Sequence, residues 1–176
     1  MDSADPKKLE ILEANIASFN PGAKVIRANL AISVEDPAKI LGKRVLVVED
    51  GPTLTHGEMT YGAGTIAAED FGAAEIVDPR PFAVGSILAI YAKYKHVKNL
   101  LPAMGYSREQ IQELEETIRR IDCDTVVAGT PVDLRRVIKV DKPIVRVRYE
   151  LDEIGHPSLA ELITERLGPR LQGRTG

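Results

Sequence analysis

The sequence has few of the features of secreted, disulfide-bonded or membrane-inserted proteins. It contains one cysteine, Cys123, in 176 residues, so no disulfide can form within the chain, and we expect this residue to serve packing. The first residues lack the charged start and apolar core of a secretory signal, and no apolar run approaches the roughly 20 residues of a membrane span. These absences predict a cytoplasmic protein with no membrane partner.

A strong excess of charge of one sign is also missing. The formal net charge is −3, so we expect no broad basic surface and no nucleic-acid partner bound through counterion release. An anionic ligand must therefore be met by a local cluster. The phosphate-loop pattern G-x-x-x-x-G-K-[ST] is absent too, because Gly42-Lys43 is followed by Arg44. By itself the chain is not expected to cradle a nucleoside triphosphate in the P-loop manner.

What the sequence does contain is an alternation of strand-like and helix-like segments. The chain is long enough to bury about 70% of its unfolded surface. Expected strands cover 24–30, 45–48, 74–77, 125–128 and 143–149. Expected helices cover 5–19, 61–71, 83–94, 107–121 and 158–167, with shorter helical turns after Asp36-Pro37 and at 133–137. This alternation predicts an α/β fold, a mostly parallel sheet with helices on both faces in a Rossmann-like three-layer arrangement.

Local signals mark where several of these helices begin. Asp5-Pro6 places a capping acid before a proline at the first helical position. Ser107 with Gln110, and Ser158 with Glu161, have the spacing of capping boxes. The first helix also carries apolar residues at helical spacing, namely Leu9, Leu12, Ile16 and Phe19. Loop structure is expected around Pro102 and Gly105, and a disordered tail over 172–176.

The segment 43–64, KRVLVVEDGPTLTHGEMTYGAG, is the stretch around which we expect a site. Val45–Val48 is a run of apolar β-formers that stops at Gly51-Pro52, which is typical of a strand buried on both faces. Polar residues follow at the carboxyl end of this strand, where open parallel sheets bind ligands. They are Glu49, Asp50, Thr53, Thr55, His56 and Glu58.

Two further expected strands end in loops that combine acid, arginine and proline, 78–81 (DPRP) and 129–136 (GTPVDLRR). In a parallel sheet all three loops lie on one edge, and their arginines can bind a phosphate or carboxylate through the planar guanidinium fork. The alternative is that Asp50, Asp78 and Asp133 cap the following helices while the arginines pair with these acids or with solvent. The sequence leaves both interpretations open.

Other candidate residues also have two interpretations. His56 and Glu58 are spaced for metal binding or proton transfer, or for ordinary hydrogen bonding. Glu49 and Asp50 can bind Mg²⁺ through their carboxylates or simply be solvated. The glycines of 61–64 would let backbone amides approach an anion at a helix start.

The last expected strand alternates valine with arginine. Val145 and Val147 predict a buried face, and Arg146 and Arg148 the opposite face. We interpret that face as the solvent side of an edge strand, with a basic ligand wall as the other interpretation.

Five segments together resemble the carboxyl-terminal half of the cyclic 2,3-diphosphoglycerate synthetase family, whose relatives are often described as predicted GTPases. The resemblance covers nearly the whole chain, and the order and length of the segments make it specific. The segments are VLVVEDGPTLTHGEMTYGAG at 45–64, AAEIVDPRP at 73–81, LLPAMGY at 100–106, CDTVVAGTPVDLRR at 123–136 and VRVRYEL at 145–151.

The resemblance implies a P-loop NTPase domain upstream, with a base-reading N-K-x-D motif just before a helix. The opening residues 1–4 resemble the end of that motif, which makes Asp2 the base-reading acid and the chain a truncated product or fragment. On this basis 1–40 is the carboxyl-terminal remnant of the NTPase domain, 41–153 an α/β substrate-side domain and 154–176 a terminal helix and tail. The upstream domain would be needed for activity.

The activity that the resemblance implies is ATP-driven closure of an intramolecular phosphoanhydride in 2,3-bisphosphoglycerate, with Mg²⁺, and with GTP as the alternative nucleotide. No cofactor is expected to be demonstrable for this chain alone. The alternatives are a GTPase fragment of unassigned substrate and a non-enzymatic dimerisation or phosphate-binding module. The residues expected to act are His56, Arg80 and Arg135 in catalysis, Thr53, Thr55, Glu58, Thr130, Asp133 and Arg136 in binding the phosphorylated substrate, and Glu49 and Asp50 at the metal.

Overall fold

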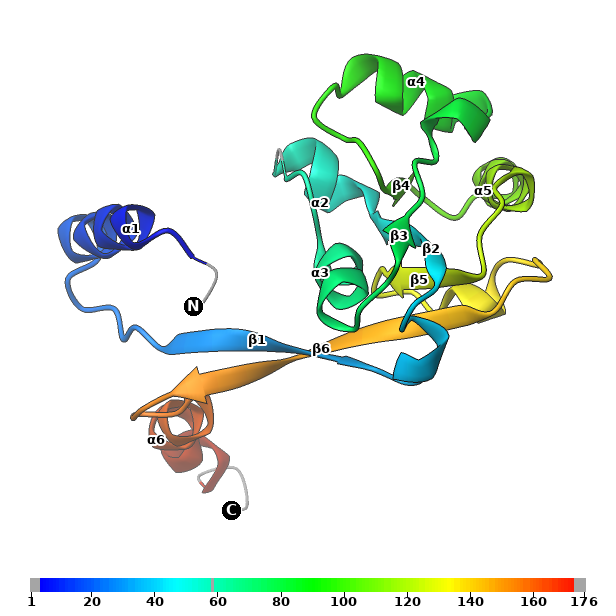
Figure 1. Cartoon of the computed structure of the whole chain (residues 1–176). Coiled ribbons are helices and arrows are strands. Elements are labelled where there is room, and N and C mark those ends of the chain that lie inside the picture. The colour runs from blue at the N-terminus through cyan, green and yellow to red at the C-terminus, as the bar shows by residue number, and fades with distance from the viewer. Residues whose placement is uncertain (1–3, 58, 173–176) are drawn as a thin grey trace. The chain divides into compact units, whose positions relative to one another are not determined.

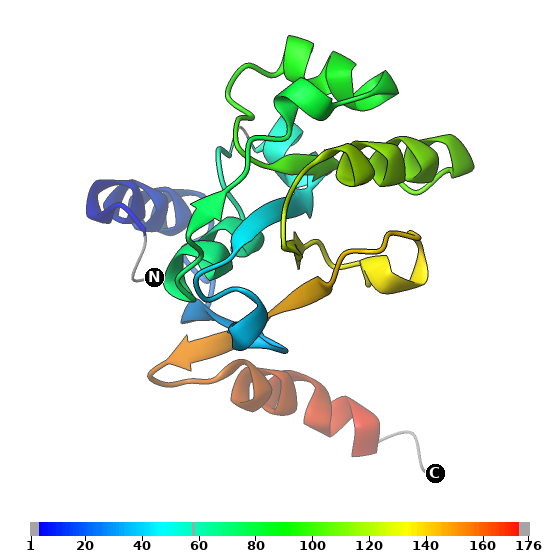
Figure 2. The same ribbon diagram turned by 45° about the vertical axis from the view of Figure 1, so that its right-hand side comes forward.

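The computed structural model describes residues 4–57 and 59–172 and divides the chain into two compact units (Figure 1, Figure 2). Unit 1 joins the residues up to Ala31 with those from Glu150 onward, and unit 2 is Ile32–Tyr149. The chain passes from unit 1 to unit 2 after Ala31 and back to unit 1 after Tyr149. The sequence analysis expected segment ends at 40 and at 153, later in the chain in each case. The assignment of those segments to an NTPase remnant and a substrate-side domain stays a prediction.

The fold is α/β with a mostly parallel sheet, as the sequence predicts. In the part of the chain that the structure describes, six strands form the sheet, in the order β1-β6-β5-β2-β3, with β4 also paired to β2. Pairing is parallel between β2 and each of β3, β4 and β5, and between β5 and β6. The strands are β1 Arg27–Val34, β2 Arg44–Asp50, β3 Glu75–Ile76, β4 Leu101–Ala103, β5 Thr125–Gly129 and β6 Ile144–Ile154.

The register along β2 decides which loops share an edge. The short strand β3 pairs only with the start of β2, where Arg44 lies opposite Glu75. The end of β2 pairs instead with β4, with Asp50 opposite Ala103. The loop that holds Arg80 therefore leaves the sheet beside the first half of β2. The expectation that it shares the carboxyl edge with the loops after β2 and β5 stays a prediction.

The helices are α1 Pro6–Phe19, α2 Gly51–His56, α3 Ala63–Asp70, α4 Gly85–Lys93, α5 Arg108–Arg120 and α6 Leu159–Gln172. Three 3₁₀ turns are η1 Pro37–Lys39, η2 Arg80–Phe82 and η3 Leu134–Arg136. Within unit 2, α3 packs on β2 and β5, and α5 lies on the opposite side of these strands in both views (Figure 1, Figure 2). No described helix combines the length and the apolar character needed to cross a bilayer.

Most of the predicted helix starts are confirmed by their hydrogen bonds. The Asp5 carboxylate accepts from the Lys7 N–H at 2.9 Å, and Ser107 and Gln110 form a reciprocal capping box. The Ser158 hydroxyl accepts from the Glu161 N–H at 3.1 Å, and the Glu161 carboxylate accepts from the Ser158 N–H at 2.7 Å. Side-chain capping is thus local enough to be recognised from the sequence.

Four details differ from the expectations. The polar segment after β2 is the helix α2, and the segment around Pro102 contains the strand β4. Strand β1 begins at Arg27, later than expected. Strand β6 lies between β1 and β5, so it is an interior strand, and the edge-strand interpretation is wrong. The tail expected to be disordered lies outside the described residues from 173 onward.

The hydrophobic core lies in unit 2. All buried apolar residues of the described chain fall between Ile40 and Val147. Val45–Val48 are fully buried, as expected for a central strand covered on both faces. Cys123 belongs to this core, so its predicted packing role is confirmed.

Candidate functional site

The carboxyl ends of β2 and β5 form the candidate site. These strands are neighbours, with Glu49 opposite Gly129. The chain leaves β2 towards β3 and leaves β5 in the opposite direction, towards β6. In open α/β sheets, ligands bind where neighbouring strands send their connections in opposite directions. The topology therefore selects this point among the strand ends of unit 2.

Glu49 is a buried acid at this point, with 2% of its surface exposed. Its Oε1 accepts hydrogen bonds from the N–H of Thr65 at 2.7 Å and from the Thr65 hydroxyl at 3.0 Å. Added methyl groups at Gly62 and Gly129 would collide with the carboxylate, at 2.5 Å from Oε2 for Gly62 and closer for Gly129. We call Glu49, Thr65 and these two glycines, with Gly64, the glutamate cradle.

The glutamate cradle has a defined electrostatic balance. Burial raises the pKa of Glu49, and the hydrogen bonds donated by Thr65, Gly64 and Gly62 oppose this rise. The backbone amides of segment 61–64, which we expected to approach an anion, therefore hold the chain's own carboxylate. Both oxygens of Glu49 lie in this enclosed environment, which leaves little room for a ligand.

Asp50 begins helix α2 and holds its first turn. Its carboxylate accepts from the Thr53 N–H at 3.3 Å and from the Thr53 hydroxyl at 2.7 Å. Among the described residues no group of three or more histidine, cysteine or acidic side chains is arranged to hold a metal ion. Mg²⁺ needs only one or two carboxylates and otherwise takes water and phosphate oxygens, so Asp50 fits this role better than the enclosed Glu49. The metal role of both acids stays a prediction.

His56 and Thr55 close the same short helix. The Nδ1 atom of His56 lies 3.1 Å from the carbonyl oxygen of Pro52, and the ring is exposed. The Thr55 hydroxyl is buried and donates to the carbonyl of Gly51 at 3.1 Å. The His56 ring is therefore accessible, and its catalytic role stays a prediction, whereas the hydroxyl of Thr55 serves its own helix.

The side chains of Tyr106 and Thr130 form a pair of hydroxyl groups at the site, although only Thr130 was predicted from the sequence. The Tyr106 hydroxyl lies 2.8 Å from Thr130 Oγ1, and Thr130 follows β5 directly. Burial raises the pKa of Tyr106, and the charge of Asp50 contributes in the same direction. Thr130 was selected from the sequence, but Tyr106 was not, although it ends one of the segments that carry the family resemblance.

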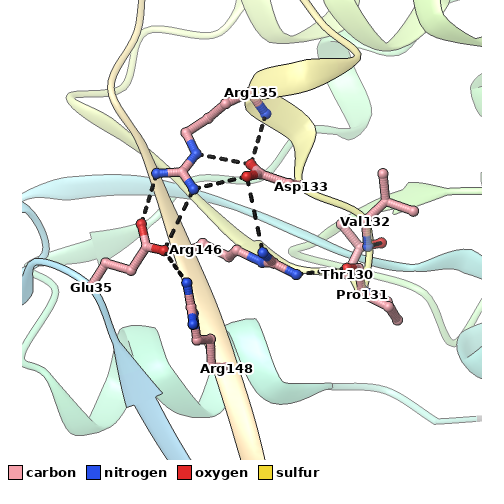
Figure 3. A network of polar contacts seen from close by, with 8 residues as sticks. All are labelled: Glu35, Thr130, Pro131, Val132, Asp133, Arg135, Arg146 and Arg148. Atoms are coloured by element: carbon pink, nitrogen blue, oxygen red, sulfur yellow. Dashed lines mark hydrogen bonds and ion pairs between the residues drawn. The ribbon is translucent and has the colours of Figure 1, made fainter.

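A network of three arginines and two acids lies next to this point, between η3, β6 and the residue Glu35 (Figure 3). Arg135 donates to Glu35 at 2.7 Å and to Asp133 at 2.9 Å. Arg148 donates to the other oxygen of Glu35 at 2.9 Å. Arg146 donates to the carbonyl of Pro131 at 2.9 Å, and its guanidinium lies 4.0 Å from Asp133. We call these five charged residues the arginine network.

The arginine network carries one more positive than negative charge. The hydrogen bond from Arg135 lowers the pKa of Asp133 to about 2, and Arg148 and Arg135 lower the pKa of Glu35. The Nε atom of Arg146 is buried and has no hydrogen-bond partner among the described residues. The network therefore keeps its acids ionised, and its one unpaired guanidinium nitrogen named here, Nε of Arg146, is enclosed by the protein.

The sequence left open that the aspartates of the three loops only cap the following helical turns and pair with the arginines, and such contacts are present in all three loops. Asp78 accepts from the Arg80 N–H at 3.0 Å and pairs with the Arg80 guanidinium at 2.6 Å. Asp133 does the same for Arg135, and Asp50 caps α2. The described chain supplies no partner for the Arg136 side chain. The structure thus pairs Asp133 with Arg135 and Asp78 with Arg80. The binding and catalytic roles of these residues stay predictions. Asp2 and Glu58, two further candidates, lie outside the described residues.

Comparison with known proteins adds one relative. No model of a protein family matches the chain. Over 165 residues, or 94% of this chain, the sequence is 58% identical to the arginine synthetase ArcE of Thermococcus kodakarensis. The chain spans 37% of the length of that relative. The relative is a synthetase, as the resemblance implied, but its name specifies arginine and not cyclic 2,3-diphosphoglycerate.

Proposed function

We propose that this chain is part of a nucleotide-dependent synthetase that forms arginine, and that unit 2 holds the amino-acid substrate or product at the carboxyl ends of β2 and β5. The observation that carries this proposal is the 58% identity to an arginine synthetase over 94% of the chain. The activity belongs to the whole protein, of which the matched segment of the relative is 37%.

The charges at the site suit arginine, which has a cationic guanidinium at one end and a carboxylate at the other. Asp50, half-buried beside the hydroxyls of Thr53 and Tyr106, offers an acid for the guanidinium or the amino group. The net positive charge of the arginine network attracts the carboxylate, which would have to share donors with Glu35 and Asp133. Segment 130–135 connects the two regions, since Thr130 bonds to Tyr106 and Asp133 belongs to the network.

The nucleotide would be held elsewhere. A nucleoside triphosphate, ATP or GTP with Mg²⁺, supplies the free energy of a synthetase reaction when it is bound. Since this sequence lacks the phosphate-loop pattern, the triphosphate would be bound by a region equivalent to the rest of the relative. Were Mg²⁺ to bind in this chain, Asp50 would hold it in place of the guanidinium or amino group and not together with it.

Cyclisation of 2,3-bisphosphoglycerate is the second candidate, and the net positive charge of the arginine network favours it. Two phosphates can be brought together only against their repulsion, which requires fixed positive charge. Arg80 and Arg135 each already pair with an acid, however, so a bisphosphate would have to displace these carboxylates. A single carboxylate would displace fewer of these contacts than two phosphates, and together with the 58% identity to an arginine synthetase this makes the arginine proposal the better supported one.

Calorimetry on the chain separates the two candidates. We expect saturable binding of L-arginine, weakened about 10- to 150-fold by Asp50→Asn, because one charge-assisted contact contributes about 1.5–3 kcal/mol. Asp141→Asn, an exposed acid, is the control. If bisphosphoglycerate binds instead and Arg80→Ala weakens it by about the same factor, the second candidate is correct. Unchanged affinity in that variant removes Arg80 from the site.

A hybrid enzyme tests the activity itself. This chain would replace the matched 165 residues of the Thermococcus kodakarensis relative, and arginine formation would be measured chromatographically with the substrates of the relative. We expect the hybrid to form arginine and Asp50→Asn to lower its rate. A folded hybrid that forms no arginine would contradict the proposal.

A further inference from the structure

Unit 1 exposes an unusual amount of apolar side chain. None of its described residues is buried, whereas unit 2 contains the whole core. Ten large apolar side chains of unit 1 are exposed, among them Phe19 at 87% and Leu30 at 61%. A unit of this size is not stabilised by its own core when nothing in it is buried.

Helix α1 shows that this exposure contradicts the sequence pattern. Leu9, Leu12, Ile16 and Phe19 recur at intervals of three and four residues, which is the pattern of a helix face that packs on a neighbour. In the structure, Leu12 is 53% exposed and no residue of α1 is buried. Leu9 and Ile16 are half-buried, so unit 1 covers this apolar face only in part and leaves Leu12 and Phe19 exposed.

Helix α6 repeats the observation. Leu159, Ile163 and Leu167 are spaced four residues apart and lie on one side of the helix, and each is exposed by 44–48%. Two helices of the same unit thus each present an apolar face. Scattered surface leucines need no explanation, but two faces at helical spacing on one unit indicate an interaction surface.

A groove lies beside α1 in the same unit. It has a volume of about 470 Å³ and is lined entirely by residues of unit 1. Its apolar lining includes Ile16, Val25 and Ile154, and the ion pair between Glu13 and Arg27, at 2.5 Å, lies in the same lining. Because Glu13, Asn20, Arg27 and His156 lie beside these apolar residues, the lining is mixed, as it is at protein interfaces, where polar groups surround apolar contacts.

We infer that the apolar faces of α1 and α6 and the groove of unit 1 dock a second folded domain, equivalent to the part of the Thermococcus kodakarensis relative outside the matched segment. That part is 63% of the relative, since the match covers 37%, and it is large enough to form a domain with its own apolar face. The inference uses the length of the relative and the exposure of unit 1, and it is independent of the substrate proposed above.

Cysteine labelling tests the inference in the hybrid described above. Leu12→Cys in α1 is compared with Leu88→Cys in α4 of unit 2, a matched control because the two leucines are 53% and 56% exposed. In the chain alone we expect a maleimide to label both at similar rates. In the hybrid we expect labelling of Leu12→Cys to be at least about tenfold slower while Leu88→Cys is unchanged. The native Cys123, which is buried, should stay unlabelled in every folded sample.

Two other results would overturn the inference. Equal labelling of both positions in the folded hybrid means that no second domain covers α1. Slow labelling of Leu12→Cys in the chain alone means that the chain itself or a second copy covers the face, and sedimentation velocity then distinguishes a monomer from a dimer. The chain alone thus provides a test even if the hybrid does not fold.

Discussion

The carboxylate of Glu49 accepts hydrogen bonds from both the backbone N–H and the hydroxyl of Thr65, at 2.7 and 3.0 Å. This contact joins the end of the central strand β2 to the first turn of α3. The first N–H groups of a helix have no partner within it and favour negative charge nearby. Glu49 satisfies that requirement from inside the sheet, so the strand end and the helix start are held as one rigid element beside the candidate site.

The glutamate cradle should not tolerate a methyl group on the β5 side. In Gly129→Ala the new Cβ would lie 2.5 Å from the backbone nitrogen of Gly64 and closer to the Glu49 carboxylate. Because backbone cannot move aside cheaply, we expect the free energy of unfolding to fall by about 1–3 kcal/mol or more. Urea denaturation followed by circular dichroism measures this change. Gly22→Ala, where the nearest atom is 4.0 Å away, is the control and should change stability little.

Glu49 should also make stability depend on pH. Its ordinary pKa of 4.5 is raised by burial in the folded protein, so the folded state binds the proton more tightly than the unfolded state. Its contribution to stability is fully present below pH 4.5 and is lost as the pH rises through the folded pKa. We expect Glu49→Gln to remove this decline from a series of urea denaturations above pH 4.5. Glu69→Gln, an exposed acid of α3, should retain it.

Local signals explain how much of the fold could be predicted. The caps at Asp5 and Ser107 act within three residues, and Val45–Val48 is apolar on both faces, so these elements were predicted correctly. Helix α2 was missed because Gly51-Pro52 was taken as a stop, although an acid before a nearby proline had correctly marked the start of α1. At α2 a glycine separates the acid from the proline, and capping by Asp50 was considered only as the alternative interpretation of this loop.

Pairing between distant strands explains what could not be predicted. Strand β4 contains Pro102 and spans only Leu101–Ala103, so its existence depends on its register with β2. Because of that register β3 pairs only with the start of β2 and β4 with its end, which no local pattern reveals. The glutamate cradle likewise needs Gly129 beside Glu49, a contact that follows from the order of the strands and not from spacing along the chain.

Asp133 should give a pH dependence of the opposite sign. The Arg135 guanidinium lowers its pKa from the ordinary 3.8 to about 2, so its contribution to stability is present above pH 3.8 and is lost as the pH falls through about 2. We expect Asp133→Asn to flatten the acid limb of the stability profile below pH 4. The effect should shrink in high salt, because the pair is near the surface. An acid limb equally steep in Asp133→Asn and in the control Asp141→Asn would contradict the prediction.

Thr117 offers a substitution that should raise stability. It lies on α5 with no exposed surface, and its hydroxyl has no hydrogen-bond partner among the described residues. Thr117→Val keeps the branched shape and removes the unpaired hydroxyl, which costs about 1–3 kcal/mol when buried. We therefore expect a higher urea midpoint with an unchanged m-value.

Thr65→Val is the control for this prediction, because the same substitution there removes a hydrogen bond to the Glu49 carboxylate. It should lower the free energy of unfolding by about 1.5–3 kcal/mol. If Thr117→Val instead lowers stability as much as Thr65→Val does, the Thr117 hydroxyl has a partner, such as a buried water, and our account of α5 packing is wrong.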